Sequence, residues 1–155
     1  MELKNIKEPW KKILQRRRLR NKWLLVFSVI CLFAALIMFL LALFSRNLSA
    51  IITLLTVAAI FTLVCIFVGT VILVLEVFER ELITKSKNII GIACVGLVQL
   101  VITVVISLHG HPFTGAILLA GSAGVLVSAI ILQYDSYRAK KILRGMKTTE
   151  EEVEI

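Results

Sequence analysis

Apolar residues in this chain are gathered into four long runs that are separated by short polar segments. The runs cover residues 23–44, 48–75, 89–108 and 113–134. An α-helix rises about 1.5 Å per residue, so each run is long enough to cross a hydrocarbon core of about 30 Å. The pattern therefore predicts an all-α fold in which four transmembrane helices form a bundle.

The composition supports a membrane protein. Hydrophobic residues make up 59% of the 155 residues and charged residues only 18%, and the mean hydropathy is +0.94. A water-soluble domain of this size would need more polar surface, so the excess apolar surface is expected to face lipid. We predict one transmembrane domain, 23–134, between a basic arm, 1–22, and a tail, 135–155. The tail is first basic and then acidic, and its acidic end is expected to be disordered.

Positive charges lie almost entirely on one side of the predicted spans. Of the 18 Lys and Arg residues, all but Arg46 fall in the arm, in the 76–88 loop or in the tail. Short segments rich in Lys and Arg stay on the cytoplasmic side of a membrane. The sequence therefore predicts an integral, multi-pass membrane protein with both termini cytoplasmic.

The basic arm is predicted to form a short amphipathic helix in the inner headgroup layer, beginning near Pro9. Trp10, Ile13 and Leu14 share one face of that helix, and basic side chains cover the rest. Each basic residue near an anionic surface adds about 1 kcal/mol of attraction. An alternative interpretation is a plain topology signal without lipid selectivity. The candidate contacts to anionic lipid are Lys11, Lys12, Arg16, Arg17, Arg18 and Arg20.

The second apolar run is longer than a bilayer requires, and acid–base pairs follow it. Glu76 and Arg80 are spaced i, i+4 with the acid first, and so are Glu81 and Lys85. This arrangement stabilises isolated helices. We therefore expect the second helix to continue beyond the membrane as a charged extension.

The last apolar run carries a stripe of small residues. Ala116, Ala120, Gly124 and Ser128 are spaced by four and lie on one side of a helix. Small side chains allow two transmembrane helices to approach closely. The stripe is therefore a candidate packing surface, either inside the bundle or against a partner protein.

Gln99 lies near the middle of the third predicted span. An unpaired amide in hydrocarbon is costly, so its side chain is expected to form an interhelical hydrogen bond. Ser122 and Thr62 fall at comparable depth and are the expected partners. The alternative interpretation places Gln99 in a polar path for ions or a substrate.

The sequence contains no motif for catalysis or cofactor binding. A Gly-rich phosphate loop, HExxH, GxSxG and paired intramembrane carboxylates are all missing. His109 and His111 share one turn and are too few for a metal site. The three cysteines are dispersed in the spans, where free Cys usually acts as a small packing residue. The chain is therefore not expected to be an enzyme or to bind a cofactor, a metal or nucleic acid.

Part of the last span resembles a known family. The segment GAILLAGSAGV, from Gly115 to Val125, and the basic end YRAKK, from Tyr137 to Lys141, resemble the last helix of MARVEL-type tetraspan proteins of the chemokine-like-factor group. The chain length, the four spans and the cytoplasmic termini are also similar to that group. The resemblance implies a role in trafficking or in stabilising a partner in vesicular or plasma membranes, and it assigns no functional residue.

These observations favour a non-catalytic small tetraspan protein that binds, stabilises or escorts another membrane protein as an accessory subunit. The expected partners are an integral membrane protein and anionic lipids at the cytoplasmic face, and the chain can also form a homo-oligomer. The alternative is a small transporter or channel that acts as a homo-oligomer. Such proteins normally keep an embedded charge or a polar helix face, and this chain offers only Gln99 with scattered Ser and Thr.

Overall fold

The structure is a computed structural model that describes residues 3–79, 81 and 83–153, and the side chains of residues 11–79, 81 and 83–145. Within those residues the chain forms the helices α1 (Leu3–Phe44), α2 (Leu48–Val77), α3 (Ser86–Leu108) and α4 (Pro112–Val153). All four contain an apolar stretch long enough to cross a membrane. The prediction of an all-α protein with four membrane-spanning helices is thus confirmed by helix length and composition.

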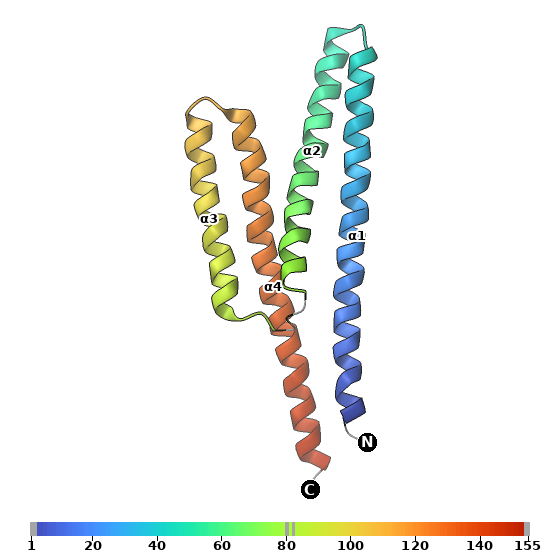
Figure 1. Cartoon of the computed structure of the whole chain (residues 1–155), viewed down its shortest axis with the longest axis vertical. Helices are drawn as coiled ribbons and strands as arrows, with labels where there is room; N and C mark the ends of the chain where they lie inside the picture. The colour runs from blue at the N-terminus through green and yellow to red at the C-terminus, as the bar shows by residue number, and fades with distance from the viewer. Residues whose placement is uncertain (1–2, 80, 82, 154–155) are drawn as a thin grey trace.

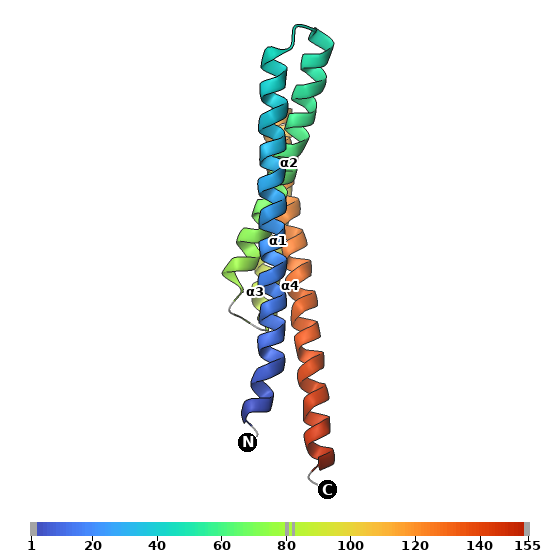
Figure 2. The same ribbon diagram turned by 90° about the vertical axis from the view of Figure 1, so that its right-hand side faces the viewer.

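The helices lie in a row rather than in a closed bundle. α1 and α2 form one antiparallel hairpin and α3 and α4 form another, and α2 joins the two hairpins by packing against α4. The order across the molecule is therefore α1, α2, α4 and α3 (Figure 1). Figure 2 shows the row from its α1 edge. α1 and α3 are the outer helices, and each packs mainly on a single neighbour.

Local sequence explains where the two hairpin turns fall. Asn47 is the N-cap of α2, and its side-chain oxygen accepts a hydrogen bond from the Ser49 N–H at 3.1 Å. Asn is among the preferred N-cap residues because it satisfies an amide that the helix leaves unpaired. Gly110 lies between α3 and α4 with a φ of 87°, which is accessible mainly to glycine.

The main apolar core lies where all four helices converge, near the end of α2 and the start of α3. Val71, Leu75 and Leu132 are buried at its centre. Leu24 from α1 and Ile89 from α3 pack against them, together with further residues of α2 and α4. Most of the large apolar side chains elsewhere on α1 and α3 are exposed. Such a surface suits lipid rather than water.

Small residues allow α3 and α4 to pack closely. A Cβ added at Gly96 would lie 2.9 Å from the Leu126 side chain, and one added at Gly115 would overlap the Ser107 hydroxyl. Gly91, in contrast, has no atom within 4 Å of an added Cβ. The close approach of α3 to α4 therefore depends on particular glycines, because a larger side chain at Gly96 or Gly115 would push the helices apart.

We call the end of the molecule where α1 begins, where α4 ends and where α2 is joined to α3 the basic end. Every Lys and Arg whose side chain is described lies there, except Arg46. α1 is continuous from Leu3 to Phe44, so the arm is not a separate short helix, and its position in the headgroup layer stays a prediction. Residues 10–23 contain no Pro or Gly, and Leu, Arg, Lys and Gln favour helix. The arm therefore extends the first span along one helix.

α2 ends at Val77, so the predicted charged extension through Glu81 and Lys85 is also wrong. The connection to α3 is instead held by other helices. The Arg17 guanidinium donates a hydrogen bond to the Glu81 carbonyl at 2.9 Å. The Thr84 N–H donates to the Ser136 hydroxyl on α4 at 3.1 Å. These tertiary hydrogen bonds satisfy backbone groups that a longer α2 would have paired within the helix.

α4 continues to Val153, well beyond the end of the apolar run at Tyr134. The acidic segment that was expected to be disordered is therefore helical as far as Val153. Glu and Lys are good helix formers, and the half-buried Ile142 and Leu143 give the extension an apolar side. The long helices α1 and α4 thus both project at the basic end (Figure 2).

Candidate functional site

Two arginines of α1 meet one aspartate of α4 at the basic end. The Arg20 Nη1 atom donates hydrogen bonds to both carboxylate oxygens of Asp135, at 3.1 and 3.3 Å. The Arg17 Nε atom lies 3.4 Å from Oδ2 of the same carboxylate. The Arg17 side chain is only 7% exposed and that of Asp135 only 13%. Removed from water, these charges depend on one another for stabilisation.

The same cluster holds the α2–α3 connection in place. Arg17 binds the Glu81 carbonyl in addition to its ion pair with Asp135. At the next position of α1, the Nε atom of the exposed Arg18 side chain lies 3.4 Å from the Oε1 atom of Glu79. α1 is therefore tied both to α4 and to the end of α2, although α1 and α4 are not neighbours in the row of helices.

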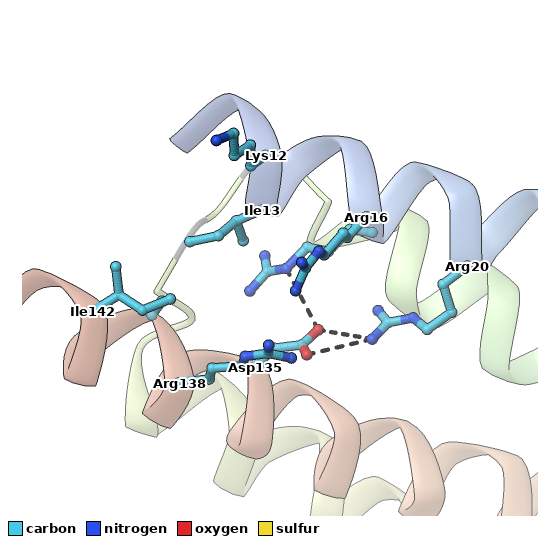
Figure 3. A pocket seen from close by; sticks show the side chains of 9 residues that line it. Lys12, Ile13, Arg16, Arg20, Asp135, Arg138 and Ile142 are labelled. Atoms are coloured by element: carbon cyan, nitrogen blue, oxygen red, sulfur yellow. Dashed lines mark hydrogen bonds and ion pairs between the residues drawn. The ribbon is translucent and has the colours of Figure 1, made fainter. Parts of the chain in front are cut away.

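A cleft opens beside these ion pairs, between α1 and α4 (Figure 3). Its volume is about 360 Å³. Residues spaced by three and four on both α1 and α4 line it, because these spacings place side chains on one helix face. The lining residues are Lys12, Ile13, Arg16, Arg17, Arg20, Asp135, Arg138, Ala139 and Ile142.

The cleft has a strong excess of positive charge. Five of its side chains are cationic and one is a carboxylate. That carboxylate is already bound by Arg17 and Arg20. Lys12, Arg16 and Arg138 are exposed, and within the described part of the chain no hydrogen bond or ion pair engages their side chains. The arrangement can attract and hold an anion, but it contains no pair of groups suited to acid–base or nucleophilic catalysis.

The six basic residues predicted to contact lipid have different positions in the structure. Lys12 and Arg16 line the cleft as exposed cations. Arg17 and Arg20 also line it, but they bind Asp135. Lys11 and Arg18 are exposed outside the cleft. Contact of the six with anionic lipid stays a prediction, and the structure separates those that hold the fold from those that are available to a ligand.

The small-residue stripe lies partly against α2. A Cβ added at Gly124 would be 2.9 Å from the Phe67 carbonyl oxygen and 2.9 Å from the Cβ atom of Thr70. Ser128 is fully buried, and its hydroxyl donates a hydrogen bond of 2.6 Å to the Gly124 carbonyl. Ala116 and Ala120, the other two members of the stripe, are only half-buried. A role of the stripe in binding a partner stays a prediction.

Gln99 does not form the predicted hydrogen bond. The Ser122 hydroxyl donates to the Leu119 carbonyl at 2.9 Å, and the Thr62 hydroxyl donates to a carbonyl of its own helix at 2.8 Å. A Cβ added at Gly121 would lie 3.1 Å from the Nε2 atom of Gln99. The amide therefore packs into the space that Gly121 leaves on α4.

Asp135 and Ser136 were not among the sequence candidates, although they are central to the basic end. One signal in the sequence could have pointed to them. Asp135 is the single Asp of the chain, it directly follows the last apolar run, and it lies on the side where the basic arm lies. An acid at that position needs a cation, and the arm supplies several.

Among the residues whose placement is described, no three His, Cys, Asp or Glu side chains gather in a way that could hold a metal ion.

Comparison of the chain with family models, with curated proteins and with solved structures finds no match. The helices themselves define the class, an all-α protein with four membrane-spanning helices. The resemblance to MARVEL-type tetraspans stays a prediction.

Proposed function

We propose that this protein is a non-catalytic tetraspan subunit that binds another integral membrane protein and stabilises or escorts it. The observation that carries the proposal is the open row of helices. α1 and α3 each pack mainly on one helix, and the rest of their surface is exposed and apolar. A transmembrane helix with one neighbour offers its remaining surface to lipid or to another helix.

The polar side chains within the spans support a role without transport. The hydroxyls of Thr62, Thr70, Thr103, Ser107 and Ser122 donate hydrogen bonds to carbonyls of their own helices. Their hydrogen-bonding groups are thus satisfied within their own helices, and none of them requires a shared polar path. A transport pathway normally has a visibly polar helix face or an embedded charge.

The test is recovery of a stoichiometric partner from native membranes in mild detergent. Truncation of exposed side chains on an outer helix, F33A with I37A on α1 or V98A with V101A on α3, should reduce recovery at least about fivefold in one of the two pairs. The matched control is I130A, an exposed position on the inner helix α4, which should leave recovery and melting temperature unchanged. Equal recovery for all variants would contradict the proposal.

One observation favours the alternative, a transporter or channel formed by several copies. Gln99 lies mid-span, and its side-chain amide forms no hydrogen bond within the described residues. If the amide lines a conduction path in an oligomer, Q99L should abolish ion flux in liposomes made with the purified protein. If Gln99 serves packing alone, Q99L changes only the thermal stability of the protein.

A further inference from the structure

We propose that the cleft between α1 and α4 at the basic end is a binding site for a phosphomonoester group, held by Arg16, Arg138 and Lys12. This site is separate from the surfaces on which partner binding would depend, so failure of either proposal leaves the other standing. The shared ligand chemistry is a doubly charged phosphate, carried either by a membrane lipid or by a soluble molecule.

The charges of the cleft are arranged so that part of them is available to a ligand. Asp135 binds the buried Arg17 and the half-buried Arg20, and its single negative charge offsets one of their two positive charges. Arg16 and Arg138 lie outside that pairing, on α1 and α4 respectively, and line the same cleft. Figure 3 shows them on opposite helices, with the Asp135 carboxylate between α1 and α4. An anion entering the cleft therefore meets cations from both sides.

Arginine is well suited to binding a phosphate group. Its planar guanidinium can donate two parallel hydrogen bonds to phosphate oxygens, and it is weakly hydrated, so its transfer from water is less costly than that of an ammonium. A monoester has three terminal oxygens and a charge close to −2 at neutral pH. It can therefore bind Arg16 and Arg138 at once, whereas a carboxylate or a phosphodiester carries one charge.

The size of the cleft suits a phosphate together with the group that bears it. Its volume of about 360 Å³ lies in the lower part of the range of small-ligand sites, which is roughly 300–1,000 Å³. Ile13 from α1 and Ile142 from α4 face the cleft and give it apolar walls. These walls can contact a glycerol or a sugar ring, which a bare phosphate ion lacks.

The position along the helices favours a lipid as the source of the phosphate. Trp23 and Tyr134 are exposed aromatic residues at the boundary of the apolar runs, where interfacial anchors are common. Arg16 precedes Trp23 by seven residues and Arg138 follows Tyr134 by four, which corresponds to about 10 and 6 Å along a helix. The cleft thus lies at the depth of the lipid headgroups.

The experiment measures binding to the full-length protein in nanodiscs and in detergent. Nanodiscs of phosphatidylcholine with either phosphatidic acid or phosphatidylserine compare a phosphomonoester with a headgroup that lacks one. Inositol trisphosphate, added to the protein in detergent, represents the soluble source. We expect phosphatidic acid to bind about tenfold more tightly than phosphatidylserine. Binding of inositol trisphosphate with no preference for phosphatidic acid would assign the site to a soluble ligand.

The decisive variant is R16Q with R138Q, which removes the two cleft arginines that do not bind Asp135 and leaves the Asp135 ion pairs intact. It should weaken binding of the preferred phosphomonoester at least about tenfold. The matched control is K11Q with K140Q, which removes two exposed cations from the same two helices outside the cleft, and it should change the affinity less than about twofold.

Two results would overturn the proposal. One is an equal loss of affinity in both double variants, since binding would then follow the net charge of the basic end alone. The other is the lack of any preference for a phosphomonoester, with phosphatidic acid equal to phosphatidylserine and no binding of inositol trisphosphate. Thermal melting of each variant separates a loss of binding from a loss of folding, and R16K with R138K should restore part of the affinity.

Discussion

Asp135 is the residue on which the arrangement of the basic end depends. It is the only carboxylate among the residues that line the cleft, and it binds arginines from a helix that does not pack directly beside its own. Arg17 adds a hydrogen bond to the α2–α3 connection. Asp135 thus links α4 to α1 and, through Arg17, to the α2–α3 connection. The link is maintained because a buried cation is stable only beside its counterion.

Replacement of this carboxylate by a neutral amide, D135N, should destabilise the protein. Arg17 would remain buried without its counterion, and breaking a buried ion pair in this way costs about 3 kcal/mol. Thermal or denaturant unfolding in detergent measures the change. E81Q is the control, because it removes an acid at the same end while keeping the carbonyl that Arg17 binds. If D135N and E81Q unfold alike, the ion pairs contribute little to stability.

At the scale of elements, α4 is the helix against which the two hairpins are assembled. Its Gly124 faces α2 and its Gly115 and Gly121 face α3. In membranes the association of helices depends on close packing rather than on the hydrophobic effect, so the smallest side chains set which faces can meet. α4 is accordingly the most buried of the four spans.

The substitution G124A tests the contact of α4 with α2. The new methyl group would lie 2.9 Å from the Phe67 carbonyl oxygen, and relief of that clash requires the two helices to separate. We expect a loss of about 1–3 kcal/mol in the free energy of unfolding. G69A, on α2, is the control because an added Cβ there has no atom within 4 Å. If G124A leaves the free energy of unfolding unchanged, the packing of α2 on α4 does not depend on Gly124.

At the scale of the whole molecule, the charge distribution and the lengths of the helices both distinguish the two ends. The turns between α1 and α2 and between α3 and α4 are short and lie at one end, and the two long charged helices project at the other (Figure 1). Four crossings return the chain to the side on which it started. The asymmetry of Lys and Arg then favours the cytoplasm for the basic end.

This orientation can be measured with reporter fusions and thiol labelling. A fluorescent reporter, active only in the cytoplasm, should give signal when it is fused to either terminus. A thiol placed by S45C, in the turn between α1 and α2, should react with a membrane-impermeant reagent from outside intact cells. A thiol placed by K87C, at the start of α3, should stay unlabelled until the cells are opened. Labelling of K87C from outside would reverse the orientation, and the unsubstituted chain controls for reaction of its own cysteines.

The sequence alone determined the number of helices and the positions of the hairpin turns. Apolar runs of membrane-spanning length and local turn residues such as Asn47 and Gly110 act within a few positions of the chain, and they are readable without a fold. Because such signals are local, sequence patterns gave wrong predictions where contacts between distant residues compete with local helix preference. The pairs of Glu76 and Glu81 with later basic residues indicated a longer α2, but Arg17 and α4 hold that segment in another conformation.

Only the tertiary structure decided which side chains share a site. Arg20 and Asp135 are separated by 115 positions in the sequence, and their contact depends on the relative register of two helices in separate hairpins. The same holds for Gln99, whose amide packs at Gly121 rather than binding a hydroxyl at equal depth. Periodicity places a residue on a face of its own helix, but the neighbour of that face follows from how all four helices pack.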